Sequence, residues 1–352
     1  MNGRGSVLTV VGLLIGASLL ARGLRTRRAI DFDGRVALIT GGSRGLGLVI
    51  AHELGRFGAR VILVAREESE LLRAQENLKS EGIDASIMVA DIGRESEAQR
   101  VVSDAVMWHG RVDVLVNNAG VIRVGPVDHM SVADYEEAMA IHFWGPFRAI
   151  RAVIPHMRRT GGGRIVNISS FGGKIGVPHL VPYCASKFAL TGLSTALRAE
   201  LAQDDILVTT VCPGLMRTGS PFNAWFKGRH RQEFAWFAIA DSLPLFSIDA
   251  RRAAAKIVDA VRHGDAELVL TWPARLAVAA AGVVPNTIAW AMEMANRLLP
   301  SRTDARGDQS HSGWQSASGW APSRLTRLSE RSAAENNELP PALASPRTQP
   351  ST

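Results

Sequence analysis

The chain has 352 residues and 46% of them are hydrophobic, which is enough for one sizeable buried core with appended segments. Its formal net charge is +7, but residues 1–30 hold five arginines and no acidic residue. The positive charge therefore belongs largely to the N-terminus, which argues against a nucleic-acid-binding face. The two cysteines, Cys184 and Cys212, fall in predicted core elements, so we expect reduced thiols in a cytosolic setting and no disulfide framework.

The N-terminal segment, residues 1–30, contains an uncharged apolar run at residues 6–21 that is followed by four arginines. This run of 16 residues is slightly shorter than the roughly 20 that cross a bilayer. A membrane anchor, a cleaved signal peptide and a helix packed on the body are the three interpretations. We favour the anchor, because the stronger positive flank lies after the run and would keep the following domain cytoplasmic.

Residues 35–40 are predicted to form the first strand, and a glycine-rich turn leads from it into a helix that ends near Phe57. Such a turn lets the backbone approach a pyrophosphate at the helix N-terminus, where free N–H groups and the helix dipole favour anions. The sequence therefore predicts a dinucleotide site at this turn, formed by Gly41, Ser43, Arg44, Gly45, Leu46 and Gly47.

The second predicted strand, residues 60–65, ends at Arg66. A carboxylate usually follows this strand where the cofactor has a free ribose 2′-hydroxyl. Here no carboxylate precedes Arg66 on the strand, and Arg66 together with Arg44 could instead hold a 2′-phosphate. The alternative is that both arginines are only solvated and do not contact a 2′-phosphate.

The chain then alternates helix and strand at short spacing, which indicates a parallel, doubly wound sheet. Strands are predicted at residues 85–90 and 112–116, and helices near residues 67–80 and 95–109. Asp91 follows one strand and could cap the next helix. A long helix, residues 134–158, contains His142.

Residues 163–190 contain the candidate catalytic groups. A β-branched run at residues 164–168 predicts a buried strand that ends near Ser170. Tyr183 and Lys187 are four residues apart in a helical pattern, so their side chains lie on one face. An ammonium group near a phenol lowers its pKa from about 10, as general acid–base catalysis near neutral pH requires. Ser170 could hydrogen-bond the oxygen whose proton is moved.

Tyr183 and Lys187, with Ser170 ahead of them, resemble the active site of the short-chain dehydrogenase/reductase family. The same resemblance extends to Thr40–Gly47, Asn117–Gly120 and Cys212–Gly214, in the family's order and spacing over roughly residues 33–270. It implies a Rossmann-like fold with a doubly wound, mostly parallel seven-stranded sheet and helices on both faces. The catalytic domain would span residues 31–272.

The resemblance also implies roles for single residues. Ser170, Tyr183 and Lys187 would be catalytic. His142 stands where the family has an Asn that helps hold a water in the proton relay, and histidine could replace it or simply belong to the core. NADP(H) would be the cofactor, and no metal is needed. Cofactor contacts are implied for Gly41, Ser43, Arg44, Gly45, Leu46, Gly47, Arg66, Asp91, Asn118, Ala119, Gly120, Tyr183, Lys187, Pro213, Gly214 and Thr218.

Three further segments bear on the substrate. Residues 221–246 hold seven aromatic side chains that could form an apolar lid or ordinary core. Residues 273–300 are an apolar helical extension that could cover the site or lie on a membrane surface. Residues 301–352 are rich in Ser, Pro, Arg and Asn, and we expect them to be disordered.

We therefore expect interconversion of a carbonyl and an alcohol on a lipophilic substrate of steroid, retinoid or fatty type, at a membrane and with the catalytic domain cytoplasmic. A membrane-tethered NADP(H)-binding sensor without turnover is the alternative, and a lipid isomerase or dehydratase on the same fold is a third. By analogy with the family, a homodimer or homotetramer would form through the helices at residues 134–158 and 182–203.

Overall fold

The computed structural model describes residues 23, 25–243, 247–323 and 326–339. The predicted anchor at residues 6–21 lies outside these residues. Within the described ranges, no helix combines the length and the apolar character that crossing a bilayer requires.

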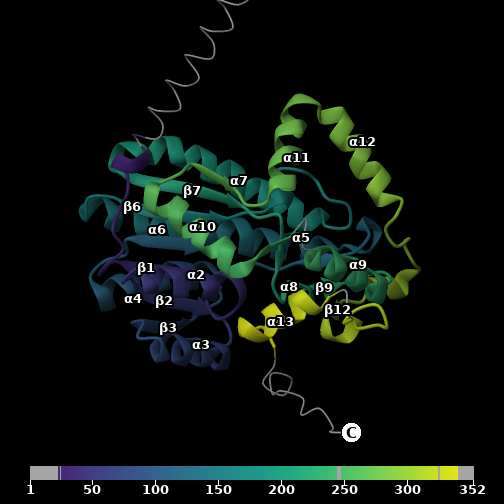
Figure 1. Ribbon diagram of the computed structural model, residues 1–352, viewed down its shortest axis with the longest axis horizontal. Coiled ribbons are helices and arrows are strands. Elements are labelled where there is room, and N and C mark those ends of the chain that lie inside the picture. Colours follow the sequence, from purple (N-terminus) through teal and green to yellow (C-terminus); the bar gives the residue numbers. More distant parts are fainter. Residues whose placement is uncertain (1–22, 24, 244–246, 324–325, 340–352) are drawn as a thin grey trace, which may run out of the picture.

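A seven-stranded sheet forms the centre of the molecule, and all its strand pairs are parallel. Its inner strands, such as β1 and β7, are buried on both faces, as continuous β-branched runs require in a parallel sheet. The predicted doubly wound sheet is confirmed (Figure 1). In spatial order the strands are β11 (Glu267–Val269), β7 (Ile206–Cys212), β6 (Gly163–Ile168), β4 (Val114–Asn117), β1 (Val36–Thr40), β2 (Arg60–Ala65) and β3 (Ala85–Val89).

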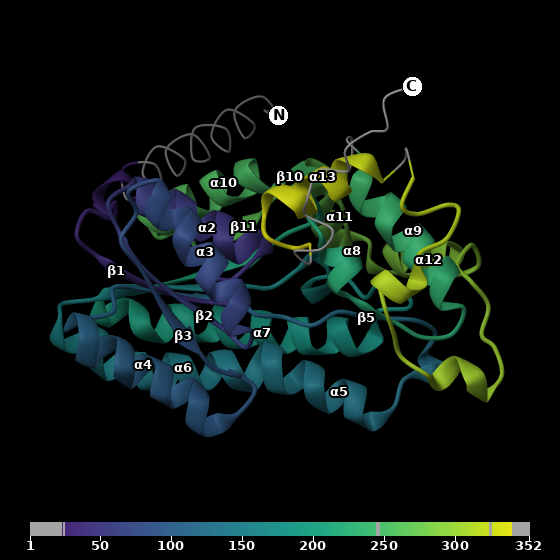
Figure 2. The ribbon, with the colours of Figure 1, turned by 90° about the horizontal axis from the view of Figure 1, so that it is seen from below.

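Helices cover both faces of this sheet and enclose two separate apolar clusters (Figure 2). One face carries α2 (Gly45–Arg56), α3 (Glu68–Ser80) and α10 (Ala250–His263). The other carries α4 (Glu95–His109), α6 (Gly145–Arg159) and α7 (Val181–Leu201). Both layers are therefore anchored to the sheet by apolar burial.

The strand order reverses between β1 and β4, which are neighbours in the sheet although β2 and β3 separate them in sequence. At such a point the loops that leave the two strands diverge and open a crevice at their carboxyl ends. The glycine-rich turn follows β1, and Asn118–Gly120 follow β4. The topology thus brings the predicted motifs to one edge of the sheet.

The helix predicted over residues 134–158 is interrupted. The chain forms α5 (Val132–Met139), a π-helical turn at Ala140–Trp144 and then α6. Pro146 has no N–H to donate to the carbonyl of His142, so one α-helical hydrogen bond is missing there. The N–H of Gly145 donates to the carbonyl of Ala140 five residues earlier, which is the π pattern. His142 lies within this wider turn.

A smaller layer of short elements closes the carboxyl edge of the sheet. A three-stranded sheet has β9 between β5 and β12, and a two-stranded sheet pairs β8 with β10. The elements are β5 (Arg123–Val124), β8 (Leu215–Arg217), α8 (Ser220–Asn223), β9 (Trp225–Phe226), α9 (His230–Ser242), β10 (Ser247–Asp249) and β12 (His311–Ser312).

The apolar extension forms two helices, α11 (Trp272–Val283) and α12 (Pro285–Asn296), which project from the body as a hairpin (Figure 1). Pro285 begins the second helix. Trp272, Leu276 and Trp290 on this hairpin are each at least 60% exposed. The hairpin therefore presents large apolar side chains to its surroundings.

The expectation of disorder after residue 300 is wrong for residues 301–323 and 326–339. The chain returns to the body, pairs β12 with β9 and forms α13 (Arg327–Glu335), which packs against α9 and β8. Composition pointed to disorder because this region has few large apolar residues. Backbone hydrogen bonds hold it, such as those from Gly228 N to Gly307 O at 2.8 Å and from Gly313 N to Ala224 O at 3.0 Å, and Trp314 stacks on Phe222 with 4.7 Å between the ring centres.

Candidate active site

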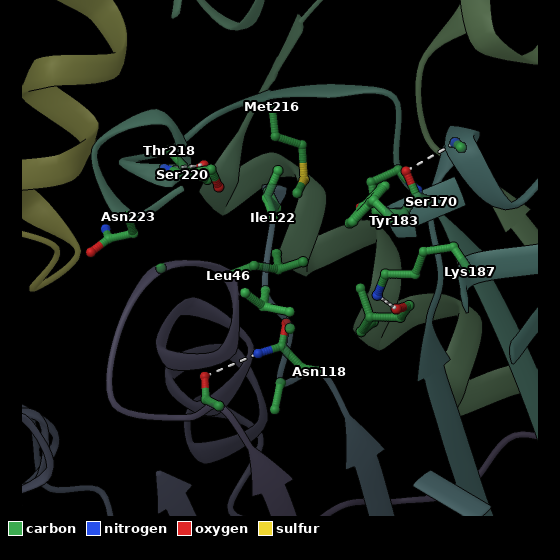
Figure 3. A pocket seen from close by; sticks show the side chains of 18 of the residues that line it. Leu46, Asn118, Ile122, Ser170, Tyr183, Lys187, Met216, Thr218, Ser220 and Asn223 are labelled. Atoms are coloured by element: carbon green, nitrogen blue, oxygen red, sulfur yellow. Dashed lines mark hydrogen bonds between the residues drawn. The ribbon is translucent and has the colours of Figure 1, made fainter. Parts of the chain in front are cut away.

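A cavity of about 800 Å³ opens at the carboxyl ends of the strands, next to the switch point between β1 and β4 (Figure 3). Its wall includes the glycine-rich turn, the loops after β4, β6 and β7, and parts of α9, α11 and α12. Most of the predicted site residues line it: Gly41, Ser43, Arg44, Gly45, Leu46, Arg66, Asp91, Asn118, Ala119, Gly120, His142, Ser170, Tyr183, Lys187, Pro213, Gly214 and Thr218. Gly47 lies behind the turn instead.

Ser170, Tyr183 and Lys187 come together at one wall of the cavity (Figure 3). Ser170 follows β6, and Tyr183 and Lys187 lie one turn apart in the first part of α7. Lys187 is buried, its Nζ donates to the carbonyl oxygen of Ile168 at 2.8 Å, and Nζ is 5.7 Å from the centre of the Tyr183 ring. The structure thus assembles the predicted group, whose catalytic roles stay predictions.

The pKa relation between these groups differs from the expectation. Burial raises the pKa of Tyr183 above its usual range, although a hydrogen bond with Ser170 opposes this shift. Burial also lowers the pKa of Lys187 to about 7. Lys187 thus carries only part of its charge at neutral pH, so the desolvation of the phenolate outweighs the help that the ammonium group was expected to give.

His142 is fully buried, and both of its ring nitrogens have partners. Its Nε2 accepts a hydrogen bond from the backbone N–H of Val121 at 3.0 Å, so Nδ1 carries the proton. Nδ1 is 2.7 Å from the hydroxyl of Ser186, which itself donates to the carbonyl oxygen of Tyr183 at 2.8 Å. Burial, together with the charge of Lys187, lowers the pKa of His142 well below its usual value.

These contacts hold His142 in place as a neutral side chain next to Tyr183. Its ring meets the ring of Tyr183 edge to face, with 5.4 Å between the ring centres. It also crowds Gly120, where a Cβ would lie 3.1 Å from Nε2. A proton relay that protonates His142 is disfavoured, because the charged imidazolium would be buried without an acidic partner.

The glycine-rich turn fits a pyrophosphate. Gly41 has φ +63°, and a Cβ on Gly47 would lie 2.1 Å from the carbonyl oxygen of Gly41, so both positions exclude side chains. Helix α2 begins at Gly45 without a side-chain cap, and Gly45 and Leu46 line the cavity, so the N-terminus of this helix lies where an anion could bind.

Asn118 and Ala119 hold this turn against β4. The Asn118 side chain donates to the carbonyl oxygens of Thr40 and Gly41, at 3.2 and 3.0 Å. The hydroxyl of Thr40 accepts hydrogen bonds from the backbone N–H groups of Asn118 and Ala119. These bonds connect the ends of β1 and β4 and fix the floor of the cavity.

The two arginines predicted for a 2′-phosphate differ in their surroundings. Arg66 is exposed at the rim of the cavity. Arg44 pairs with Glu70, with 2.7 Å between Nη1 and Oε1, and the same carboxylate accepts from the hydroxyl of Ser43 at 2.9 Å. Asp91 lines the cavity and accepts from the N–H of Gly93 at 3.0 Å, but it does not cap α4, whose N-cap residue is Arg94 and which has no side-chain cap. Its contact with the cofactor stays a prediction.

The loop after β7 forms the opposite wall. A Cβ on Gly214 would lie 2.4 Å from the hydroxyl of Thr271, so the close packing needs glycine there. Thr218 is buried and its hydroxyl lies 2.7 Å from that of Ser220 (Figure 3). Cys184 and Cys212 are both buried and free, as predicted.

The aromatic segment is mainly core and only partly lid. Phe222, Phe226 and Phe234 belong to a buried cluster, while Trp236 and Phe237 line the cavity. The indole N–H of Trp236 donates to Glu233 at 2.7 Å, which fixes the ring over the cavity. Phe246, the remaining phenylalanine of this group, lies outside the described residues.

Four acidic side chains at the cavity were not predicted: Glu67, Glu70, Asp241 and Glu338. Asp241 is buried on α9, and burial together with the nearby Glu338 raises its pKa to about 8. Its signal in the sequence is a lone carboxylate among aromatic and alanine residues. Glu338 carries no such signal, because it lies in a polar segment far along the chain.

Comparisons with known proteins agree with this geometry. Residues 35–224 match the family described as short chain dehydrogenase. Dehydrogenase/reductase SDR family member 4 of Bos taurus is 33% identical over 222 residues, which cover 61% of this chain and 80% of the relative. The chain belongs to the short-chain dehydrogenase family.

Two similar solved structures contain NADPH, and they come from enzymes with different substrates. An actinorhodin polyketide ketoreductase with NADPH is 31% identical with a TM-score of 0.61, and the match covers 69% of this chain and 97% of the ketoreductase. L-sorbose reductase from Gluconobacter frateurii, complexed with NADPH and L-sorbose, is 25% identical with a TM-score of 0.62, covering 69% and 97%. This short-chain dehydrogenase is thus an oxidoreductase by family, while its neighbours in structure differ in substrate.

Proposed function

We propose that this short-chain dehydrogenase reduces a carbonyl group, or oxidises the corresponding alcohol, on a lipophilic substrate with NADP(H). The observation that carries the proposal is the group of Ser170, Tyr183 and Lys187 at the wall of a cavity that aromatic side chains partly cover. The NADPH complexes among its structural neighbours support the choice of cofactor.

The residues present fit this cofactor. The glycine-rich turn and the N-terminus of α2 would hold its pyrophosphate, Asn118–Gly120 and Asp91 would lie along the adenosine half, and Arg44 and Arg66 would face a 2′-phosphate. Lys187 and Thr218 would hold the nicotinamide half, between the loops that carry Ser170 and Pro213. When bound, the cofactor supplies or accepts the hydride.

The chain's own residues would handle the substrate oxygen and its proton. Ser170 hydrogen-bonds the oxygen and keeps it beside Tyr183. In reduction, the Tyr183 hydroxyl donates its proton to that oxygen, and its raised pKa keeps this hydroxyl protonated before the reaction. Lys187 supplies positive charge next to the phenolate that remains, and His142 holds the Tyr183 ring by its edge.

Three features support a lipophilic substrate with one polar group. Trp236 and Phe237 cover the cavity, and Ala277 and Met292 of the projecting hairpin line it from another side. Asp241 is largely protonated at neutral pH because burial raises its pKa to about 8. A neutral carboxyl group can donate a hydrogen bond to a polar atom at the far end of such a substrate.

We also propose that the protein is membrane-associated, with the catalytic domain on the cytoplasmic side. The exposed Trp272, Leu276 and Trp290 support this, because apolar helix faces with tryptophan bind lipid interfaces. Flotation of the full chain with lipid vesicles would test it, with Trp290→Ser as the variant expected to weaken binding. Recovery of the full chain at the bottom of the gradient would contradict the proposal.

Self-association through the faces of α6 and α7 is proposed by analogy with the family. Trp144, the last residue of the π-helical turn before α6, and Phe188 on α7 are 44% and 45% exposed, which supports an apolar contact there. Sedimentation of the full chain, with Phe188→Glu as the disrupting variant, tests the proposal. A monomer at micromolar concentration would reject it.

The central experiment uses the two tyrosines of the chain, Tyr183 and Tyr135. NADPH and NADH oxidation are followed with the full chain on a panel of steroid, retinoid and fatty carbonyls and on small sugars. Tyr183→Phe should lower kcat by about 10²–10⁴-fold, the usual contribution of general acid–base catalysis, while Tyr135→Phe leaves it unchanged. Strong activity on sugars with none on lipophilic carbonyls would overturn the substrate proposal.

A further inference from the structure

The C-terminal strap, which we define as residues 326–339, ends inside the glycine-rich turn. The backbone N–H of Gly45, the first residue of α2, donates to the carbonyl oxygen of Asn336 at 2.9 Å. The N–H of Gly219 donates to the carboxyl group of Glu338 at 2.6 Å. The strap therefore already uses one donor from the glycine-rich turn and one from the loop between β8 and α8.

Asn337, between these two residues, fixes the strap to the same turn. Its Nδ2 donates to the carbonyl oxygens of Ser43 and Glu70, at 2.8 and 3.1 Å, and its Oδ1 accepts from Nε of Arg73 at 3.0 Å. Its φ is +57°, a conformation that asparagine adopts more readily than most residues. The strap is thus fitted to this position by three successive residues.

Glu338 fills the space that the turn leaves open. It is buried, and its Oε1 lies 3.0 Å from where a Cβ on Gly45 would stand. Its own Cβ would lie 2.7 Å from a Cβ on Gly219. The absence of side chains at these two glycines is what admits the Glu338 carboxyl group. The N-terminus of α2, which the fold offers to an anion, is therefore the place where this acidic side chain lies.

The contacts that hold the strap are mainly polar. The hydroxyl of Ser332 donates to the carbonyl oxygen of Arg217 at 2.7 Å, and the hydroxyls of Ser242 and Ser329 are 2.8 Å apart. The strap's apolar contacts are those of Ala333, the buried apolar side chain of α13, and of Leu339, which packs half-buried against the aromatic cluster. Water can replace hydrogen bonds of this kind, so the strap can leave without uncovering a large apolar surface.

We propose that the strap is a built-in competitor of the dinucleotide, with Glu338 lying in the pyrophosphate position of the glycine-rich turn. This inference rests on the proposed function, because it takes the turn to be the cofactor site. Strap and cofactor use the N–H of Gly45 and the same space, so they exclude each other. The apparent affinity for NADP(H) is then reduced by the fraction of molecules whose strap is docked.

The test is direct titration of the full chain with NADPH, followed by the fluorescence of the cofactor. Glu338→Ala removes the carboxyl group from the turn and should lower the Kd for NADPH about tenfold, which corresponds to about 1.4 kcal/mol. Glu335→Ala is the matched control, because Glu335 lies on the same strap but faces solvent beside Arg331. An unchanged or a higher Kd in Glu338→Ala would overturn the proposal, the latter by showing that the strap helps to hold the cofactor.

A second measurement needs no variant. Amide hydrogen exchange of the unmodified chain should show residues 326–339 losing protection when NADPH is added, while α2 and α7 gain it. Retained or increased protection of the strap on NADPH binding overturns the proposal, even if Glu338→Ala does not fold.

These experiments separate this inference from the proposed function. NADPH binding that leaves the strap in place rejects the competitor and keeps the enzyme. NADPH binding that releases the strap, in a protein that turns over no carbonyl of the panel, supports the competitor and rejects the enzyme. Absence of NADPH binding by both the unmodified chain and Glu338→Ala rejects both.

Discussion

The parallel-sheet body and the region after the projecting hairpin, residues 301–323 and 326–339, meet at the same turn but are held by different contacts. In the body, strands such as β1 and β7 bury every side chain between two helix layers. In the later region, the buried side chains are mostly polar, and among its described residues the buried apolar ones are Ala321 and Ala333. Apolar burial makes the body cooperative, whereas hydrogen bonds that water can replace leave the other region separable.

This difference in contacts allows the body and the later region to have different roles at the site. The body supplies the glycine-rich turn, Tyr183 and Lys187 from elements that cannot move without breaking the sheet. The strap reaches the same turn from a sequence distance of nearly 300 residues, through Gly45 and Glu338. It can change the occupancy of the site while the catalytic group stays in place.

The largest effect on the free energy of unfolding should come from a comparison of two glycine-to-alanine substitutions, one in each region. A Cβ on Gly47 would lie 2.1 Å from the carbonyl oxygen of Gly41, and a Cβ on Gly313 would lie 2.2 Å from that of Pro221. Gly47→Ala should reduce the free energy of unfolding by about 3 kcal/mol, because both atoms belong to the body. Gly313→Ala should instead detach residues 301–339 and shift the main urea transition by less than about 1 kcal/mol. Equal losses in the two variants would show that the later region is an integral part of the body.

The preference for NADPH over NADH should depend only on residues of the body. Arg66→Asp replaces a positive charge at the cavity rim with a negative one, so the preference for NADPH over NADH should fall about tenfold to hundredfold. The Kd values for both cofactors measure this, and Arg56→Asp, at the far end of α2, is the control. A preserved preference would show that Arg66 does not meet the 2′-phosphate.

The pH dependence of turnover should follow Lys187. Burial lowers its pKa to about 7, so the ammonium form is present below that pH and is lost above it. The kcat/KM for reduction should therefore fall about tenfold per pH unit above pH 7, since kcat/KM reports groups of the free enzyme. In Lys187→Arg the charge persists, and whatever activity remains should be flat from pH 7 to 9. A decline of equal slope in that variant would assign the titration to another group.

The smallest predicted effect is the pH dependence of strap docking. Burial raises the pKa of Glu338 from 4.5 to about 7, so the docked strap binds a proton more readily than the free one. Docking is then strongest below pH 4.5 and weakens as pH rises to about 7. The groups that face Glu338 are Arg44, whose charge lowers its pKa, Glu70, which raises it, and Asp241, whose own pKa is raised.

The ratio of NADP⁺ Kd values, unmodified chain over Glu338→Ala, should therefore grow a few-fold as pH falls from 8 to 6. Taking this ratio removes the titration of the cofactor's own 2′-phosphate, which also has a pKa near 6. Glu338→Gln cannot ionise, and its ratio to Glu338→Ala should not change with pH. A ratio for the unmodified chain that stays constant or falls toward acid would contradict the assignment.

Local sequence patterns were sufficient to predict the body. Continuous β-branched runs predicted its strands, helical patterns predicted most of its helices, and glycine spacing predicted the turn, because each depends on near neighbours in sequence or on a single backbone conformation. The four-residue spacing of Tyr183 and Lys187 likewise predicted that they share one face of α7. The π-helical turn at His142 was missed, although Pro146 marks it, because the effect of a proline on a carbonyl four residues earlier depends on how the two helix segments are packed.

Only the tertiary structure decided the electrostatics and the occupancy of the site. Burial from several elements at once raised the pKa of Tyr183 and lowered that of Lys187, and no spacing in the sequence measures burial. The polar composition after residue 300 predicted disorder, since it contains too little apolar area to fold alone. Contacts with β9, α9 and the glycine-rich turn order that region, and they bring Glu338 to Gly45 because the body supplies the donors that a polar chain needs.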